Sequence, residues 1–299
     1  MLRKLYGALI LMSCMSVIAS AQTGAKPLGM VLDVQGTVTI QRGQNREPAL
    51  PAELLFAGDQ ITTAANGKVT FSFCPPNQRY SLNADSAISV AAAEIQQTKG
   101  APASKAAAAR CTLPQVALGK RDTKHIGAMG ARGYPAIPVY VGGIISTGRP
   151  RFMWGTPVPT VQEYKLTLKA SGGKELWTWT GQGSEVQLPE TVAELQPGNY
   201  VWELVGNAGG NKAAEQTSPF EVKPNPDVTS AARSQGISPL EMATIYENAG
   251  YYSEAAAIYR TLRAQNGNDK RFSQTLLWLY FETGLFAASN IEYEKLKAQ

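Results

Sequence analysis

The sequence predicts a multi-domain chain in which two all-β domains are followed by an antiparallel α-helical repeat tail. Apolar and polar residues alternate in short runs between residues 28 and 90, and again between residues 137 and 224, as in half-buried strands. After residue 238 the apolar positions follow a helical spacing and recur at an interval of 34 residues. The length of 299 residues accommodates two or three domains of ordinary size.

Residues 1–21 have the composition of a secretory signal peptide. Arg3 and Lys4 form a positive start, residues 5–18 are mostly apolar, and Ala19-Ser20-Ala21 is an A-x-A cleavage site. We therefore expect an exported protein that is either periplasmic or held at the cell surface. Lipidation at Cys14 is the alternative, because the residues before it loosely resemble a lipoprotein signal.

The first β-domain is predicted over residues 28–116, with an Ala-rich excursion near its end. Its apolar residues alternate with polar ones, so each run predicts a strand with one inward face. Asn66-Gly67 predicts a tight hairpin turn, because both residues tolerate positive φ. The residues predicted to face inward are Leu32, Val34, Val38, Ile40, Val69, Phe71 and Phe73.

Three segments of this domain resemble the β-rich sensor domain of the FecR family. They are G-x-V-x-x-V-x-G-x-V (Gly29 to Val38), L-x-x-G-D-x-I-x-T (Leu55 to Thr63) and a later run that ends in S-x-I-x-V (Ser86 to Val90). The resemblance implies the fold of that sensor domain. Sensors of this family also carry an anti-sigma segment and a membrane-crossing helix ahead of the domain, and this sequence shows neither. Because these two features are not seen, FecR-type signal regulation is an alternative and not the expected function.

Cys74 and Cys111 are the cysteine pair that remains if Cys14 leaves with the signal peptide. In an oxidising compartment such a pair predicts a disulfide, which would tie the Ala-rich excursion to the strand that ends at Cys74. A reactive thiol pair is the alternative, although no C-x-x-C spacing is present. Within the excursion, Ser104 to Arg110 predicts a short helix, because alanine has the highest helix propensity.

The second β-domain is predicted over residues 137–224, after a Gly-rich linker at residues 117–136. Its strand-like runs recur with Gly and Pro turns between them, which favours a sandwich. The L-x-P-G-x-Y-x-W segment (Leu195 to Trp202) resembles the turn into a late strand of fibronectin-type or immunoglobulin-like domains. Four tryptophans are expected to fill the core, with stacking on sugar rings as the alternative: Trp154, Trp177, Trp179 and Trp202.

The helical tail is predicted over residues 238–299, after a Pro-containing linker at residues 225–237. Ser238-Pro239-Leu240-Glu241 is a capping box with proline at the first helical position, which predicts where the first helix begins. The pattern Y-x-x-x-G-x-Y-x-x-A-x-x-x-Y (Tyr246 to Tyr259) resembles the tetratricopeptide repeat, which implies two antiparallel helices per unit. Two units are expected, defined by residues 34 positions apart: Tyr246 and Tyr280, Gly250 and Gly284, Tyr252 and Phe286, Tyr259 and Tyr293.

The sequence shows no reaction chemistry, so we expect a non-enzymatic protein without a catalytic, cofactor or metal site. Its single histidine, His125, lies in a Gly-rich segment and cannot by itself supply a zinc site. A catalytic triad would also have to use this residue, and no nucleophile-elbow glycines surround a serine. The net charge of +5 is not gathered into a basic, aromatic-rich stretch, so no nucleic acid partner is expected.

The expected function is that of an exported binding or scaffold protein of the cell envelope. The helical repeats are expected to contact a partner protein, as the resemblance to tetratricopeptide repeats implies. Two repeats are fewer than the roughly three that usually bury a continuous core, so the preceding domain, self-association or a partner is expected to cover them. Binding of a cell-wall polysaccharide through the β-domains is the alternative.

Overall fold

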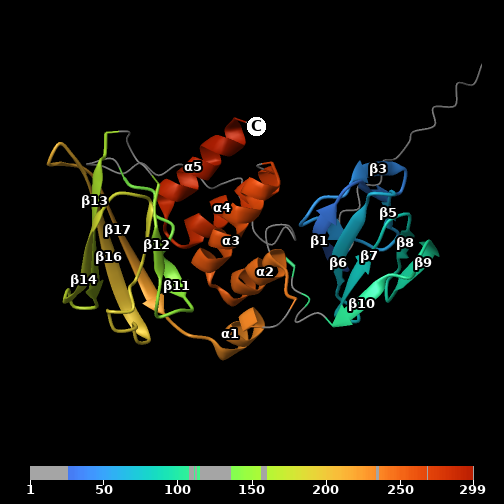
Figure 1. Ribbon diagram of the computed structural model, residues 1–299, viewed down its shortest axis with the longest axis horizontal. Coiled ribbons are helices and arrows are strands. Elements are labelled where there is room, and N and C mark those ends of the chain that lie inside the picture. The colour runs from blue at the N-terminus through green and yellow to red at the C-terminus, as the bar shows by residue number, and fades with distance from the viewer. Residues whose placement is uncertain are drawn as a thin grey trace, which may run out of the picture.

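The computed structural model describes residues 26–107, 111, 113–114, 136–155, 160–233, 236–267 and 269–298. The predicted signal peptide with Cys14, the position of His125 and nearly all of the predicted linker 117–136 lie outside these residues. The N-terminal part of the chain is built from strands and the C-terminal part from five helices. Figure 1 shows the helices lying between the two β-rich parts. No helix in the described ranges is long and apolar enough to cross a membrane.

The described part of the first β-domain contains ten strands. They form two five-stranded sheets, β10-β7-β6-β1-β4 and β3-β2-β5-β8-β9, which enclose one hydrophobic core. Val38, Ile61 and Phe71 are among its buried residues. The strands are β1 (Gly29–Gln35), β2 (Val38–Arg42), β3 (Asn45–Pro48), β4 (Leu54–Leu55), β5 (Gln60–Thr63), β6 (Lys68–Phe73), β7 (Gln78–Leu82), β8 (Ala87–Val90), β9 (Ile95–Lys99) and β10 (Ser104–Ala107).

Strand β1 contributes side chains to two cores, which its alternating pattern does not predict. Its pairing with β6 shifts between Val31 and Asp33, as at a β-bulge. Val31 lies in the core of the first β-domain, whereas Met30 and Leu32 belong to the core that contains the helices. The prediction that Leu32 faces inward together with Val38 is therefore wrong, because the bulge changes the alternation at that point.

Residues Ser104–Ala107 of the Ala-rich excursion form strand β10, so the helix predicted over Ser104 to Arg110 is wrong for the residues that the structure describes. β10 pairs antiparallel with β7, with Ser104 opposite Ser81 and Ala107 opposite Gln78. The open edge of β7 offers a full row of backbone hydrogen bonds, and this tertiary context overrides the helix propensity of alanine. The predicted disulfide between Cys74 and Cys111 is confirmed, and it bridges a separation of 37 residues.

Among the described residues of the second β-domain there are seven strands. Five of them make the sheet β11-β17-β16-β13-β14, in which β11 alone runs parallel to its neighbour. The short β12-β15 pair packs over this sheet through Phe152, whose ring centroid lies 5.0 Å from that of Trp202. The strands are β11 (Gly143–Ile145), β12 (Arg151–Met153), β13 (Glu163–Ala170), β14 (Glu175–Gly181), β15 (Glu185–Gln187), β16 (Gly198–Ala208) and β17 (Asn211–Val222).

Five helices follow the strands. The first, α1 (Pro226–Arg233), lies in the range predicted as a linker, and α2 (Pro239–Ala249) begins at the predicted capping box. In that box the Glu241 amide donates to the Ser238 hydroxyl at 3.2 Å, and the Ser238 amide donates to Glu241 Oε2 at 2.8 Å. The other helices are α3 (Tyr252–Gln265), α4 (Lys270–Glu282) and α5 (Phe286–Lys297).

The helices α2–α3 and α4–α5 form two hairpins whose geometry repeats after 34 residues. Gly250 and Gly284 follow the first helix of each hairpin, with φ values of 85° and 72°. The amide after each glycine bonds to the carbonyl five residues earlier, at 2.9 Å in the first hairpin and 2.8 Å in the second. Glycine suits this position because a side chain disfavours positive φ.

Candidate functional site

A single hydrophobic core runs from the second β-domain through the helices to strand β1. It includes Trp202 of the second β-domain, Leu276 and Tyr280 of α4, and Met30 and Leu32 of β1, each at most 4% exposed. The helical hairpins therefore bury apolar surface against both β-domains. These apolar faces of the helices are covered within the chain.

A buried ion pair joins the first β-domain to the start of α2. Arg79 on β7 donates through Nη2 to Glu241 Oε2 at 2.6 Å and through Nε to Oε1 at 3.3 Å. The two side chains are 15% and 3% exposed. Arg79 also donates to the carbonyl of Gly236, just before the helix. Because Glu241 also closes the capping box, one carboxylate links the cap of α2 to the β-domain.

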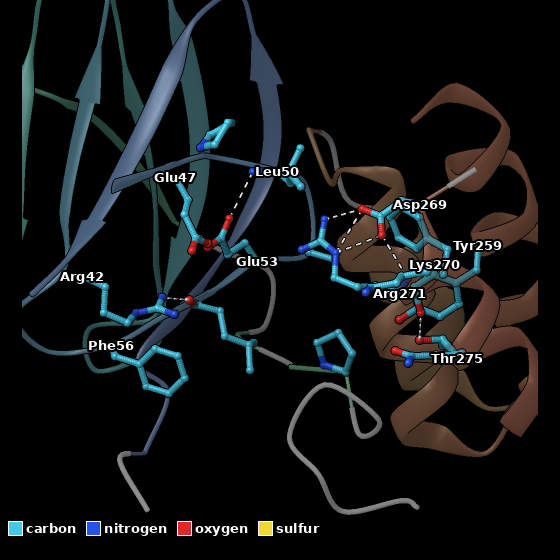
Figure 2. A pocket seen from close by; sticks show the side chains of 16 residues that line it. Arg42, Glu47, Leu50, Glu53, Phe56, Tyr259, Asp269, Lys270, Arg271 and Thr275 are labelled. Atoms are coloured by element: carbon cyan, nitrogen blue, oxygen red, sulfur yellow. Dashed lines mark hydrogen bonds and ion pairs between the residues drawn. The ribbon is translucent and has the colours of Figure 1, made fainter. Parts of the chain in front are cut away.

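An open groove of about 510 Å³ lies between the first β-domain and the start of α4 (Figure 2). One wall is the β3–β4 connection, and the other is formed by the first turns of α4 with Tyr259 of α3. Arg271 connects the two walls, because its Nη2 donates to the carbonyl of Pro51 at 2.8 Å. Leu50 lines the groove and is 47% exposed, more than any other large apolar side chain in the described ranges. We call this site the partner groove.

Charged residues of both signs lie around the partner groove. Arg42 donates two hydrogen bonds of 2.9 Å to the buried carboxylate of Asp59, and these bonds raise the pKa of Arg42. Burial opposes ionisation of Asp269, but the hydrogen bonds from Arg271 lower the pKa of Asp269 below its usual value. Burial raises the pKa of Glu53. The groove thus combines fixed charges with an exposed apolar side chain.

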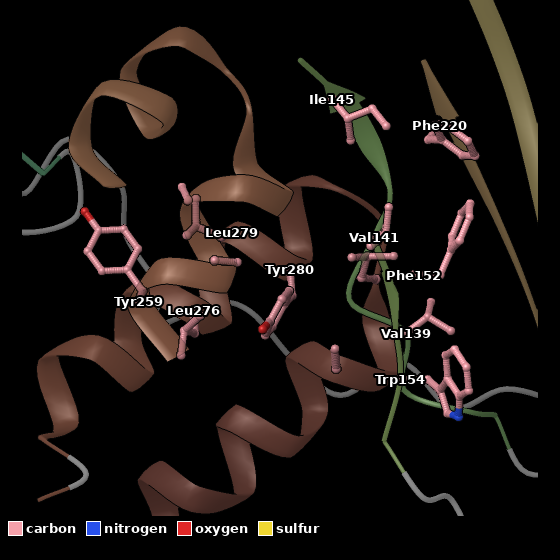
Figure 3. Packing of buried hydrophobic residues seen from close by; sticks show 14 of the residues in the cluster. Val139, Val141, Ile145, Phe152, Trp154, Phe220, Tyr259, Leu276, Leu279 and Tyr280 are labelled. Carbon is pink, nitrogen blue, oxygen red and sulfur yellow. The ribbon is translucent and has the colours of Figure 1, made fainter. Parts of the chain in front are cut away.

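The hairpins also pack on the second β-domain, where Tyr280 and Val141, two residues before β11, belong to the same core (Figure 3). The Tyr280 ring centroid lies 5.5 Å from that of Tyr140. The Ser253 hydroxyl donates to the Gly142 carbonyl at 2.7 Å and accepts from the Gly142 amide at 3.0 Å. A Cβ on Gly142 would lie 2.8 Å from Leu285 Cδ2 and 3.0 Å from Ser218 Oγ, so these side chains would have to shift to admit one. The hairpins thus contact the second β-domain through hydrogen bonds as well as through apolar packing.

The residues that define the repeats are mainly packing residues, and the structure does not gather them into one site. Tyr259 and Tyr280 are each 1% exposed, and the Tyr259 hydroxyl donates to the buried Glu247 at 2.7 Å. Burial raises the pKa of Tyr259 well above its usual value, and the neighbouring Glu247 adds to this effect. Phe286 is 38% exposed at the start of α5. The remaining aromatic members are half-buried: Tyr246, Tyr252 and Tyr293.

The four tryptophans of the second β-domain form part of its core and edge. Trp154 and Trp202 are 2% and 0% exposed. Trp177 and Trp179 lie on β14 opposite buried leucines of β13, so their rings share the inner face of the sheet. Their rings lie 6.2 Å from Phe152 and 5.7 Å from Trp154, respectively. This arrangement favours core packing over a flat platform for sugars.

Sequence reasoning did not find the partner groove. Leu50 lies in a short turn between Pro48 and Pro51, and Arg79 is an isolated arginine on a strand, so neither carries a spacing signal. Glu241 is recognisable in the sequence as a helix cap, but not as the partner of Arg79. Within the described residues, no group of three or more His, Cys, Asp or Glu side chains could hold a metal ion.

Comparison with known proteins assigns no family to this chain. No family model and no curated protein matches the sequence. Among solved structures, 28% of the chain is similar to 84% of CopC from Methylosinus trichosporium OB3b, at 20% identity and a TM-score of 0.22. Another similarity joins 66% of the chain to 95% of a two-domain fibronectin type-III segment from chicken tenascin, at 10% identity and a TM-score of 0.24. A β-glucuronidase from Ruminococcus gnavus is matched over 45% of its length, at 10% identity and a TM-score of 0.21. These scores are too low to support an argument about function.

Proposed function

We propose that the protein is a non-enzymatic, exported scaffold of the cell envelope that binds a partner protein at the partner groove. The observation that carries this proposal is the exposed Leu50 in an open groove beside helices whose buried apolar residues pack within the chain. Export is supported by the Cys74–Cys111 disulfide, since disulfides persist in oxidising compartments. The helical hairpins then act as a hub for the two β-domains, and the hub supplies one wall of the docking site.

The groove favours a partner segment in extended conformation. β3 is the edge strand of its sheet, all four of its residues are exposed, and it contributes Glu47 and Pro48 to the groove. An edge strand offers free backbone groups to an added strand, and alternate side chains of that strand then enter adjacent pockets. An apolar side chain of the partner would contact Leu50, and acidic neighbours would pair with the exposed Lys270.

Three finer fold assignments accompany this proposal. The first β-domain is assigned to the FecR-like class on its three matching segments. The second is assigned to fibronectin- or immunoglobulin-like sandwiches on its two packed sheets and the Leu195 to Trp202 segment. The hairpins are assigned to tetratricopeptide-like repeats on their 34-residue spacing and the glycines that end their first helices.

Site-specific photo-crosslinking in the producing cell tests the proposal. A photo-reactive phenylalanine analogue at Leu50 and, separately, at Gln274 on the opposite wall is expected to capture the same protein. The same probe at Glu175, exposed on β14 of the second β-domain, is the control and should not capture it.

The captured protein, once purified, should bind the intact chain. Leu50→Asp should weaken this binding by about tenfold or more, because it places a charge against an apolar contact. Different proteins captured from the two walls, or unchanged binding of the Leu50→Asp variant, would contradict the proposal.

Binding of a cell-wall glycan is the second candidate, and one observation favours it. Trp177 and Trp179 are half-buried on the edge strand β14, so part of their surface reaches solvent. Aromatic surface of this kind can stack on sugar rings. Co-sedimentation with purified cell wall that is lost in Trp177→Leu, with an unchanged circular dichroism spectrum, would support this candidate. Absence of co-sedimentation for the unaltered protein would remove it.

A further inference from the structure

A second pocket of about 750 Å³ lies between α3 and the second β-domain, and it shares no lining residue with the partner groove. Residues at helical spacing on α3 line one side: Glu254, Ala257, Thr261 and Ala264. The two alanines leave room for a ligand between the helix and the domain. The volume lies in the range of sites for small organic molecules. We call this the arginine pocket.

Four arginines line the arginine pocket: Arg149, Arg151, Arg260 and Arg263. Two of them are paired with carboxylates, Arg151 with Glu185 and Arg263 with Glu292. The other two have no carboxylate within ion-pair distance in the part of the chain that the structure describes. The pocket therefore carries positive charge that internal ion pairs do not compensate.

Arg260 and Arg149 are nevertheless held in place. The Arg260 guanidinium carbon lies 4.0 Å from the centroid of the Tyr140 ring, and Nη1 lies 4.0 Å from Met153 Sδ. Nη1 of Arg149 donates to the carbonyls of Pro189 at 3.0 Å and Val192 at 3.3 Å. A ring and neutral carbonyls orient a guanidinium without cancelling its charge, and its remaining donors suit a planar anion.

Glu254 adds a carboxyl group with one unused oxygen. Its Oε1 accepts a hydrogen bond from the Ser146 amide at 2.5 Å, whereas Oε2 is buried and has no hydrogen-bond partner among the described residues. Leaving a buried polar atom unpaired is costly, so a bound partner for Oε2 would be favoured. Burial raises the pKa of Glu254 to about 7, and below that pH the group can donate a hydrogen bond.

We propose that the arginine pocket binds a small acidic ligand through an oxyanion, with Arg149 and Arg260 supplying the positive charge and Glu254 a hydrogen bond. The hydroxyl groups of Thr147 and Thr261 also line the pocket and can bind further polar groups of the ligand. The oxyanion can belong to an organic acid, such as a sugar acid, or to a free inorganic anion. The proposal does not depend on the partner protein, because the two sites are separate.

Ligand affinity should fall as the pH rises through about 7, because ionised Glu254 repels an anion. The groups that face Glu254 are the Ser146 amide from the second β-domain and the phenols of Tyr246 and Tyr251 from the first hairpin. Burial, with the nearby charge of Glu254, raises the pKa of both phenols, so they stay neutral over this range. The other charged groups of the pocket are the four arginines and Glu185.

Calorimetric titration of the full-length, oxidised protein tests the proposal. The probes are D-galacturonate, sodium sulfate and, as the uncharged control, D-galactose. Galacturonate should bind at about pH 6 and bind about tenfold more weakly at about pH 8.5, whereas galactose should not bind. Binding of galacturonate without sulfate assigns the site to an organic acid, and binding of both shows that an oxyanion suffices. Failure of both anions to bind, or equal binding of galactose, would overturn the proposal.

Substitutions locate the binding to the pocket. Arg260→Met should weaken anion binding by about tenfold or more, and Arg149→Met provides an independent test if the first variant does not fold. Glu254→Gln should keep binding near neutral pH and remove its pH dependence. Lys297→Met, at the exposed end of α5, is the control and should bind as the unaltered protein does. Unchanged affinity in both folded arginine variants would place any anion binding elsewhere.

Discussion

Replacing Arg79 tests whether the ion pair with Glu241 fixes the first β-domain to the helices. Both side chains are largely buried, at 15% and 3% exposure, so Arg79→Met would leave the carboxylate of Glu241 without its cation. Breaking a buried pair in this way typically costs about 3–5 kcal/mol, against about 0.2–1 kcal/mol for an exposed pair. Glu241→Gln removes the charge but keeps the capping box, since glutamine also serves at that position. The double variant should therefore recover a large part of the loss.

The assay is urea unfolding followed by circular dichroism, with hydrogen exchange of α2 to locate the destabilised region. The matched control is Lys169→Met, whose pair with Glu203 has a similar distance of 2.7 Å but is 29% and 41% exposed. A double-mutant cycle over Arg79 and Glu241 should give a coupling free energy of about 2 kcal/mol or more. A loss in Arg79→Met no larger than in the control, with no faster exchange in α2, would show that this ion pair does not fix the first β-domain to the helices.

Three further predictions concern the disulfide, a repeat glycine and Glu254. The double substitution Cys74→Ser and Cys111→Ser removes the disulfide and should lower the free energy of unfolding by about 4 kcal/mol, because a bridge across 37 residues restricts the unfolded chain. Equal stability of the variant and the unaltered protein in urea unfolding would contradict this. Gly284→Ala should cost about 1–2 kcal/mol in thermal unfolding through its φ of 72° alone, because nothing lies within 4 Å of the new Cβ. Glu254 has its pKa raised from 4.5 to about 7, so the folded state binds a proton more tightly than the unfolded state. The stabilisation that Glu254 contributes should thus be complete below about pH 4.5 and be lost, by about 3 kcal/mol, as the pH rises through about 7, whereas Glu254→Gln should lack this contribution; an identical pH dependence of stability in both proteins would count against it.

The order of strands followed by helices could be predicted because alternating apolar residues indicate strands and apolar residues at helical spacing indicate helices. The capping box at Ser238 and Glu241 marks the start of α2, and the glycines at 250 and 284 mark the turns of both hairpins. The Cys74–Cys111 disulfide followed from counting cysteines in a chain that the sequence predicts to be exported. Each of these features depends on residues close in sequence or on a single pairing.

The features that were missed depend on contacts between distant segments. The alternating pattern of β1 predicts that Leu32 faces the core of the first β-domain. Because of the β-bulge, Leu32 instead packs in the core that contains the helices. Ser104 begins a strand because it pairs with the open edge of β7. The helix propensity of alanine gives no information about such a distant strand. The two pockets arise where modules meet, so their arginines and Leu50 carry no local signature.

The enclosure of the hairpins changes what their resemblance to tetratricopeptide repeats implies. Tyr280, which defines the repeat, is buried within the chain, and Tyr259 lines the partner groove with only 1% of its surface exposed. A partner protein would instead meet the boundary between the hub and the first β-domain. The proposed function therefore requires that the two β-domains and the helical hairpins form one rigid body.

Pulsed electron-spin distance measurement tests that dependence most directly. Spin labels on Gln96→Cys in the first β-domain and Glu175→Cys in the second β-domain occupy exposed positions, and the native disulfide leaves Cys74 and Cys111 unlabelled. If the helices hold the two β-domains together, the unaltered chain should give one narrow distance distribution, and this distribution should broaden in Arg79→Met. A broad distribution in the unaltered chain, no wider in the variant, would show that the helices do not hold the two β-domains together.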